Sequence, residues 1–411
     1  MSNENKLIPE LRFPEFEKNG EWVETTIEQV AKVTTGNKDT QNKVENGKYP
    51  FFVRSQTVER INSYSFDGEA ILTSGDGVGV GKNFHYINGK FDFHQRVYCI
   101  YDFLNDVCGE FVFMFFSQHF NERVMKMSAK NSVDSVRMAM ITEMPICLPS
   151  KNEQQKIASC LLSLDEVIAA HSQKLNLLKE HKKGMMQNLF PQEGEKVPKY
   201  RFKEFENDGE WVEEPLSSKI SVIDGDRGLN YPKAEEYSSD GYCLFLSAKN
   251  VTKIGFLFNE FQFITKEKDE LLRKGKLARF DIVLTTRGSL GQFAFFDENI
   301  QFENIRINSG MVILRAKDNG INPNYLYSYF NSNSIQSAIK SQGFGNAVQQ
   351  LTVAVINNFT LRYPYSPKEQ QKIAYCLSSL DALITAQAEK IEQLKLHKKG
   401  LMQGLFPKIN E

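Results

Sequence analysis

The sequence predicts a mixed α/β protein in which two α/β domains are separated by two long helices that form an intramolecular antiparallel coiled coil. Two observations support this prediction. Two sequence blocks each occur twice within the 411 residues, and the longer block carries an apolar heptad pattern. The stretches between the blocks differ from each other, but both contain strand-like runs and glycine-rich turns. Solenoid repeats are only about 20 to 50 residues long, so this long-period repeat indicates a duplicated two-part module.

The repeated blocks define the domain boundaries. RFPEFEKNGEW at 12–22 returns as RFKEFENDGEW at 201–211, and each copy contains one of the two tryptophans. EQQKIA at 153–158 returns at 369–374, and both copies continue to a Leu-Phe-Pro ending at Pro191 and Pro407. We therefore expect domain 1 at 1–148, a first spacer helix at 149–192, domain 2 at 193–366 and a second helix at 367–411.

Each spacer is expected to form one long helix, because its apolar residues alternate in steps of three and four. Pro149 and Pro367 precede these helices, where proline is tolerated. His171 and Gln387 occupy the same position in the middle of the two seams, and a polar residue there is typical of a device that fixes register. Two separate helices, each packed on its own domain, remain the alternative. The seam consists of Ile157, Leu161, Leu164, Ile168, His171, Leu175 and Leu178 in the first helix, and of Ile373, Leu377, Leu380, Ile384, Gln387, Ile391 and Leu394 in the second.

The variable stretches are predicted to be mixed α/β. Runs at 70–74 and 281–286 are strand-like and are followed by glycine-rich loops. Further strand-like runs lie at 97–101 and 310–314, and helix-like stretches follow at 109–127 and 325–340. Both domains therefore share the same succession of elements.

Composition leaves the nature of the partner open. Fifty basic and fifty-one acidic residues give a net charge of −1, so DNA would have to be held by local basic patches or with the help of other subunits. The six cysteines form no C-x-x-C pair, and no metal site or disulfide framework is predicted. The sequence shows neither a signal-peptide pattern nor a long apolar stretch, so we expect a cytoplasmic protein.

No motif indicates catalysis. The glycine-rich run from Gly75 to Lys82 lacks the spacing of a phosphate-binding P-loop, because Asp76 stands at the first glycine position and Asn83 at the Ser/Thr position. Asn322-Pro323 is interpreted as a helix start with a capping asparagine. We therefore expect a chain that is not an enzyme and has no catalytic residues.

Several loops of the variable stretches interleave basic and amide side chains with aromatic residues. Arg, Asn and Gln hydrogen-bond base edges in pairs, whereas Lys and Ser contacts to phosphates position a protein on DNA. The candidate DNA-binding residues are Arg54, Ser55, Lys82, His94, Gln95, Arg96, Asn131 and Arg137 in domain 1, and Arg227, Lys249, Asn250, Arg287, Arg306, Asn308, Asn346, Gln349 and Gln350 in domain 2.

The order of these parts resembles the specificity (S) subunit of type I restriction-modification systems over nearly the whole chain. The marks of this resemblance are the Glu-Gln pairs at 153–154 and 369–370, the HKKG(M/L)MQ helix ends at 181–187 and 397–403, the LRFPEF opening, and TSGDGVGVG at 73–81. The second helix starts two residues nearer its proline than the first.

The resemblance implies a noncatalytic subunit in which two target recognition domains read an asymmetric, two-part sequence of double-stranded DNA. It further implies that two modification (M) subunits dock on the repeated helices and that restriction (R) subunits join through the complex. S-adenosylmethionine, ATP and Mg are then expected in the partner subunits and no cofactor in this chain. A cytoplasmic coiled-coil scaffold that binds only proteins is the alternative function.

Overall fold

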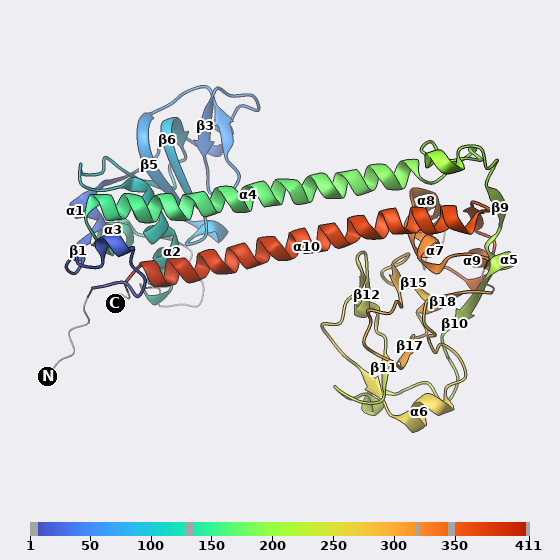
Figure 1. Cartoon of the computed structure of the whole chain (residues 1–411). Helices are drawn as coiled ribbons and strands as arrows, with labels where there is room; N and C mark the ends of the chain where they lie inside the picture. The colour runs from blue at the N-terminus through green and yellow to red at the C-terminus, as the bar shows by residue number, and fades with distance from the viewer. Residues whose placement is uncertain (1–6, 128–134, 318–319, 344–349, 408–411) are drawn as a thin grey trace. The chain divides into compact units, whose positions relative to one another are not determined.

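The computed structural model divides the chain into two compact units, each with one α/β domain and part of both long helices (Figure 1). Unit 1 comprises residues 1–172 and 389–411, and unit 2 comprises residues 173–388. The structure describes residues 7–127, 135–317, 320–343 and 350–407. The units divide both long helices near their middle, whereas the boundaries expected from the sequence lie close to where these helices begin.

Domain 1 is built on a six-stranded sheet with the order β2-β7-β5-β6-β3-β4. All neighbouring strands are antiparallel except β3 and β6, which are parallel. A separate pair, β1 and β8, lies next to the start of the first long helix in sequence. The elements are β1 (Val23–Thr26), α1 (Ile27–Val30), β2 (Lys32–Thr35), β3 (Tyr49–Phe52), β4 (Glu59–Ile61), β5 (Phe66–Ser74), β6 (Phe84–Phe93), β7 (Val97–Tyr101), α2 (Gly109–Met127), α3 (Met138–Thr142) and β8 (Pro145–Leu148).

Domain 2 repeats this plan, but its counterparts of β5 and β6 are shorter. The sheet β10-β18-β15-β16 corresponds in order and direction to β2-β7-β5-β6, and β9 pairs with β19 as β1 pairs with β8. The stretch expected as one helix at 325–340 forms two, α7 and α8, separated by Asn331 and Ser332. The elements are β9 (Val212–Pro215), α5 (Leu216–Lys219), β10 (Ile220–Asp224), β11 (Cys243–Phe245), β12 (Val251–Thr252), β13 (Gly255–Phe256), β14 (Phe263–Ile264), α6 (Lys266–Leu271), β15 (Ile282–Thr285), β16 (Phe293–Phe295), β17 (Ile305–Arg306), β18 (Met311–Ala316), α7 (Pro323–Phe330), α8 (Asn333–Gly343), α9 (Val353–Asn357) and β19 (Thr360–Tyr363).

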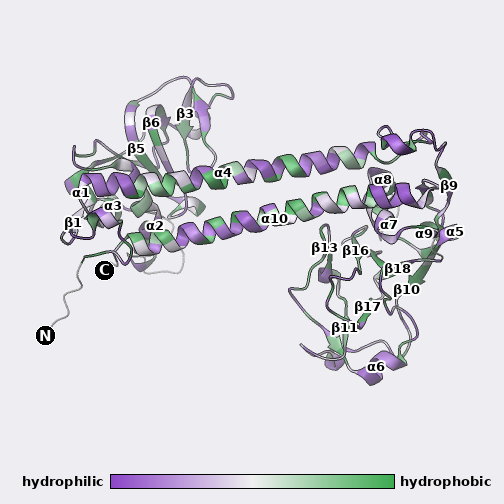
Figure 2. Ribbon diagram, viewed as in Figure 1, coloured by the Kyte–Doolittle hydropathy of each residue, from purple (hydrophilic) through white to green (hydrophobic). Residues whose placement is uncertain are grey.

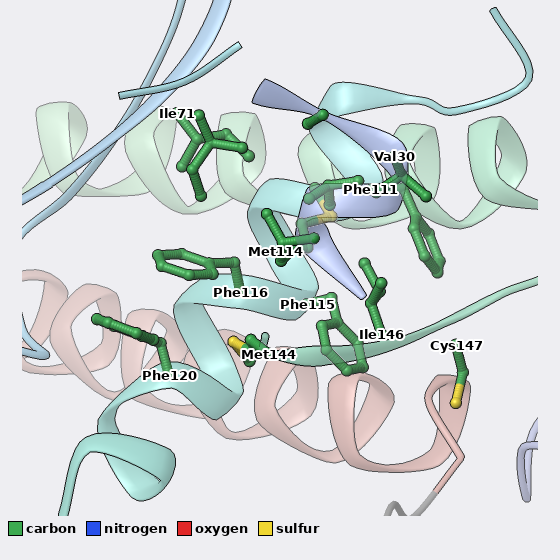
Figure 3. Close-up of a cluster of buried hydrophobic side chains, with 14 of the residues drawn as sticks. Val30, Ile71, Phe111, Met114, Phe115, Phe116, Phe120, Met144, Ile146 and Cys147 are labelled. Atoms are coloured by element: carbon green, nitrogen blue, oxygen red, sulfur yellow. The ribbon is translucent and has the colours of Figure 1, made fainter. Parts of the chain in front are cut away.

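The core of unit 1 is dominated by aromatic side chains of α2. Phe111, Phe115, Phe116 and Phe120 are fully buried, and Figure 3 shows them along α2 beside residues such as Ile146. Burial of one such side chain contributes about 1.5–3 kcal/mol relative to its exposure. The periodicity within 109–127 therefore reflects a helix that covers the sheet.

Two helices of almost equal length carry the heptad pattern: α4 (Lys151–Asn188) and α10 (Pro367–Leu405). Apolar and polar residues alternate along both, and within each unit the two helix segments run side by side in opposite directions (Figures 1 and 2). Every predicted seam residue is buried or half-buried. The sequence therefore predicted the antiparallel pairing correctly.

None of the described helices is long and apolar enough to span a membrane.

Cross-helix ion pairs fix the same register in each unit. In unit 1, Lys398 lies 2.5 Å from Asp165, and in unit 2, Lys182 lies 2.5 Å from Asp381. The two lysines are equivalent positions of the repeat, and so are the two aspartates. Each unit thus makes the same antiparallel contact with residues of the opposite helix.

The helix ends belong to the domain cores. Ile157 and Leu161 near the start of α4 join the core of unit 1, together with Leu405 and Phe406 near the end of α10. In unit 2, residues 373 and 377 of α10 join the core together with residues 189 and 190, which directly follow α4. The two alternatives drawn from the sequence are therefore combined: the helices pair with each other, and their ends also pack on the domains.

A buried arginine-glutamate pair attaches the repeated N-terminal segment to each helix. Arg12 donates two hydrogen bonds of 2.8 Å to the carboxylate of Glu153, and Arg201 makes the same two bonds with Glu369. Both glutamate side chains are only 1% exposed. The indole Nε1 of Trp211 also donates to Glu369. Bidentate arginine–carboxylate pairs of this kind are among the strong ion pairs in proteins. This accounts for the presence of the same arginine and the same glutamate in both copies of the repeat.

The glutamine after each of these glutamates fixes the loop that precedes a domain helix. Gln154 accepts a hydrogen bond from the backbone N–H of Cys108 and donates to the carbonyl of Pro149. Gln370 accepts from the N–H of Asn322 and donates to the carbonyl of Pro364. Both side chains are buried, so the bonds satisfy backbone groups that have lost contact with water.

We predict that Arg201→Ala destabilises unit 2 by about 3–5 kcal/mol, because it leaves the buried carboxylate of Glu369 without its cation. Urea unfolding followed by the fluorescence of Trp211, in a Trp22→Phe background, measures this loss. Lys196→Ala in the same background is the control, because the Lys196–Glu210 pair is more than 60% exposed and exposed pairs are worth about 0–1 kcal/mol. Equal losses in the two variants would contradict a structural role for the buried pair.

Two carboxyl groups meet at the N-terminal end of α2. The hydroxyl of Tyr86 donates to Glu69 at 2.7 Å, and Glu69 also contacts Glu110 in the first turn of the helix. Burial, and next the like charge of Glu110, raise the pKa of Glu69, although the Tyr86 bond opposes this shift. The folded state therefore binds this proton more tightly than the unfolded chain does.

We predict that Glu69→Gln loses less stability than the wild type when the pH rises from about 4 to 7. The contribution of a carboxyl group with a raised pKa is complete below its unfolded pKa of about 4.3 and is lost as the pH rises through the folded pKa. Urea midpoints across this pH range measure the difference. Asp67→Asn on the same strand serves as the control, and parallel pH profiles for Glu69→Gln and the wild type would refute the prediction.

Candidate nucleic-acid interface

Five loops of domain 1 meet around the turn that follows β5. The N–H of Gly75 donates to the carbonyl of Arg96, and the N–H of Val136 donates to the carbonyl of Gly75. The side chain of Asn83 donates to the carbonyl of Arg54, and Gln95 N–H donates to a carbonyl at residue 38. These bonds join segments 36–39, 53–57, 75–83, 94–96 and 135–137 into one surface, which we call rim 1.

The centre of rim 1 is an acidic residue between two arginines. Asp76 accepts from Nη1 of Arg54 at 2.8 Å and from Nη1 of Arg96 at 2.6 Å, one bond to each carboxylate oxygen. Burial alone would raise the pKa of Asp76, but the hydrogen bonds and charges of the two arginines outweigh it and lower the pKa. Asp76 is therefore ionised near neutral pH. Asp76 was not among the candidate residues chosen from the sequence. An acidic residue within a glycine-rich loop, with basic loops before and after it in the sequence, could have indicated an ion pair there.

The other candidates of domain 1 lie on or near the same rim. Lys82, Gln95 and Arg137 are exposed, and Ser55 is half-buried with its hydroxyl bonded to the Thr57 carbonyl. Asn131 lies outside the described residues. Rim 1 thus gathers polar loops that are distant in sequence into one surface with basic and amide donors.

Domain 2 forms an equivalent surface, rim 2, from different side chains. Ser74 pairs with Val97 in domain 1, and Thr285 pairs with Met311 at the corresponding place in domain 2. The residues that follow, Gly75 and Thr286, make the same two backbone hydrogen bonds. Thr286 donates to the carbonyl at residue 310 and accepts from the N–H at residue 351, as Gly75 does with residues 96 and 136. Rim 2 accordingly consists of segments 225–230, 246–250, 286–292, 307–310 and 350–352.

Close approach of two loops requires glycine at the same place in both rims. A Cβ on Gly36 would lie 2.1 Å from the carbonyl oxygen of Phe93, and a Cβ on Gly225 would lie 2.3 Å from that of Asn308. No side chain fits in such a contact. The repeat in backbone architecture is therefore retained although the surface residues differ.

The candidates of domain 2 divide into exposed and bonded groups. Arg287 is exposed, Arg227 is half-exposed and bonds Asp224 and the carbonyl of Ser309, and Lys249 forms an exposed ion pair with Glu260. Asn308 accepts the N–H of Gly310, and Gln350 is half-buried. Asn346 and Gln349 lie outside the described residues.

Three candidates are structural instead and leave our set of DNA contacts. Arg306 is 5% exposed and bonds Asp269 together with three backbone carbonyls. Asn250 is 2% exposed and bonds Ser247 and the carbonyls of residues 257 and 260. His94 is 3% exposed, and burial followed by the charge of Arg54 lowers its pKa, so it is neutral at pH 7. Sequence alone does not distinguish such buried polar residues from exposed ones.

The rims consist of exposed polar loops. Among the described residues, no group of three His, Cys, Asp or Glu side chains is arranged to hold a metal ion. What the rims offer is exposed guanidinium, ammonium and amide donors on loops fixed by backbone bonds. Such donors suit phosphate oxygens and the acceptor atoms on base edges.

Comparison with known proteins places the chain in a family. The profile described as the type I restriction modification DNA specificity domain matches residues 19–180 and again 222–396. The chain is 26% identical over 185 residues to the EcoDI specificity subunit of Escherichia coli, a match that covers 44% of this chain and 40% of that subunit. It is 24% identical over 304 residues to the putative MjaX specificity subunit of Methanocaldococcus jannaschii, which covers 71% of this chain and 66% of that subunit.

Solved structures show the same fold. The S subunit of the type I restriction-modification system from M. genitalium superposes with a TM-score of 0.63 at 16% identity, covering 98% of this chain and all of that one. A second solved chain comes from a structural study of complex assembly and conformational transition of the type I R-M system. It superposes with a TM-score of 0.58 at 15% identity, covering 94% of this chain and 97% of that one. With two family domains, the repeated helices and this shared fold, the chain belongs to the family of type I restriction-modification specificity subunits.

Proposed function

We propose that this chain is the DNA sequence-recognition subunit of a type I restriction-modification complex and reads an asymmetric, two-part target. The observation that carries the proposal is the pair of rims: one backbone architecture, repeated on one framework, presents different side chains. Two readers of equal shape and different chemistry fit a target whose two halves differ in sequence. The reader in domain 1 would use Arg54, Arg96 and Lys82, and the reader in domain 2 would use Arg227 and Arg287.

We further propose that the repeated helices dock two modification subunits and that restriction subunits join through the complex. The repeat supports this, because each unit contains the same antiparallel helix contact and so offers one of two equivalent surfaces to two identical partners. In this scheme the chain itself is noncatalytic and acts on cytoplasmic DNA. S-adenosylmethionine, ATP and Mg would serve the partner subunits.

Mobility shift of the full chain with duplex DNA, with and without modification subunits, tests the proposal against the protein-only scaffold. Sequence-selective retardation is expected. Loss of binding should be steep between 50 and 200 mM salt, because phosphate contacts release counterions. A chain that assembles with modification subunits but retards no duplex would favour the scaffold.

We predict opposite behaviour for two arginines of domain 2. Arg287→Ala should weaken DNA binding and change unfolding stability by less than about 0.5 kcal/mol, because the residue is exposed. Arg306→Ala should cost about 1–3 kcal/mol of stability, because Asp269 keeps only Lys276 as a cationic partner and three backbone carbonyls lose their buried donor. Urea unfolding and DNA titration of both variants measure the contrast. The assignment fails if Arg306→Ala is fully stable or Arg287→Ala binds normally.

We also predict that the two domains are separable readers. Replacement of residues 23–147 with the corresponding region of another specificity subunit should change one half of the methylated sequence and leave the other half intact. Genome-wide mapping of methylated adenines in cells that carry the exchanged chain and its partner subunits measures this. A change in both halves would show that the domains do not read DNA independently.

A further inference from the structure

We propose that Asp76 is a positioning residue of the DNA-reading site in domain 1: it orients Arg54 and Arg96 so that their guanidinium groups meet the acceptor atoms of guanine in the major groove. This inference rests on the proposed function of the chain. It adds a residue and a base to that function.

The geometry of the three side chains supports an orienting role. The Asp76 side chain is 15% exposed, whereas Arg54 and Arg96 are 43% and 63% exposed. Each arginine contacts the carboxylate through Nη1, and among the described residues no acceptor is found for Nε or Nη2 of either one. The half-buried acid therefore holds each arginine by one donor and leaves the other guanidinium donors available to a ligand.

The backbone around Asp76 is held on both sides. Asp76 forms an isolated β-bridge with Ser135, and the preceding Gly75 bonds the carbonyl of Arg96 and the N–H of Val136. The residue lies two positions after Ser74, where β5 ends. A carboxylate on so fixed a backbone reduces the rotamer freedom of two long side chains before DNA arrives, which lowers the entropic cost of binding.

The acid favours base reading over phosphate binding. A carboxylate at the centre of a phosphate-binding cluster weakens attraction to the DNA backbone, because like charges repel. Guanine presents O6 and N7 as two acceptors in the major groove, and the planar arginine fork matches them. An aspartate that orients two guanidinium groups contributes selectivity for guanine, even though it lowers the local positive charge.

The central residues of rim 2 carry the same formal charge as those of rim 1 in a different arrangement. By strand register, Arg287 occupies the place of Asp76, and Gly310 occupies the place of Arg96. Rim 1 thus has two arginines around one aspartate where rim 2 has a single central arginine. The two centres therefore have the same formal charge but place their hydrogen-bond donors differently. This suits two domains that read different half-sites.

Two substitutions separate orientation from charge. Asp76→Asn keeps the shape of the side chain and removes its charge, whereas Asp76→Glu keeps the charge and displaces the carboxylate by about one bond length, roughly 1.5 Å. The full chain, assembled with modification subunits, is used to select duplexes from a randomised library. Exchange of residues 23–147 identifies the half-site that domain 1 reads.

We expect guanine in that half-site and a loss of guanine preference of about fivefold to 150-fold at one position in both variants. Non-specific binding of Asp76→Asn should be unchanged or stronger, because a negative charge has been removed. If Asp76 acted only through its charge, Asp76→Asn would bind specific and non-specific duplexes more tightly alike, and Asp76→Glu would match the wild type. Asp67→Asn, an equal change of charge at an exposed site of β5, controls for general electrostatics.

The outcomes distinguish this inference from the proposed function. A wild-type chain that selects no sequence overturns the proposed function itself. Selection of a half-site without guanine, or guanine preference retained in both variants, overturns only the role of Asp76. If the Asp76 variants lower the thermal stability of the chain, Arg96→Lys replaces them: it keeps the charge and loses the fork, so retained guanine preference would equally refute the inference.

Discussion

The buried pairing of an arginine with a glutamate, made once in each unit, is the interaction on which the rest of the structure depends. Arg12 and Arg201 each join a segment before a variable domain to the first turn of a long helix through Glu153 and Glu369. Because a buried charge without its partner is strongly destabilising, neither residue of the pair is replaceable alone. The adjacent glutamine then binds the loop before α2 or α7. One dipeptide therefore fixes both the N-terminal segment and the domain to the same helix end.

The framework allows surface variation without loss of fold. Rim 1 and rim 2 are built on equivalent backbone hydrogen bonds, so side chains that point outward are free to differ. The bonds of Gly75 and Thr286 are the same although one residue is a glycine and the other a threonine. Recognition chemistry is thus confined to loops whose positions the sheets determine, a common division between a rigid scaffold and its functional loops.

The helices serve two purposes at once. Their ends complete the cores of the two units, and their middle parts pair through a narrow seam with Lys182 and Lys398 bonded to aspartates across it. A two-helix seam buries its residues only in part, whereas Ile157, Leu161, Ile373 and Leu377 are fully buried because they also join the domain cores. Of the remaining seam residues, only Gln387 and Ile391 are buried and the others are half-buried. Ion pairs at equivalent positions then give both units the same register.

The sequence alone determined the duplication, the strand-rich domains and the antiparallel helices, because repeats and hydrophobic periodicity are properties of the residue order. It also selected most of the loops that form the rims. Only the tertiary structure decided which polar residues of those loops face solvent. Arg306 and Arg287 carry the same guanidinium group, but one is enclosed by Asp269 and backbone carbonyls while the other is exposed. Likewise, Asp76 gains its place between Arg54 and Arg96 only when three loops distant in sequence meet, because the positions of side chains across loops depend on strand pairing that local periodicity does not encode.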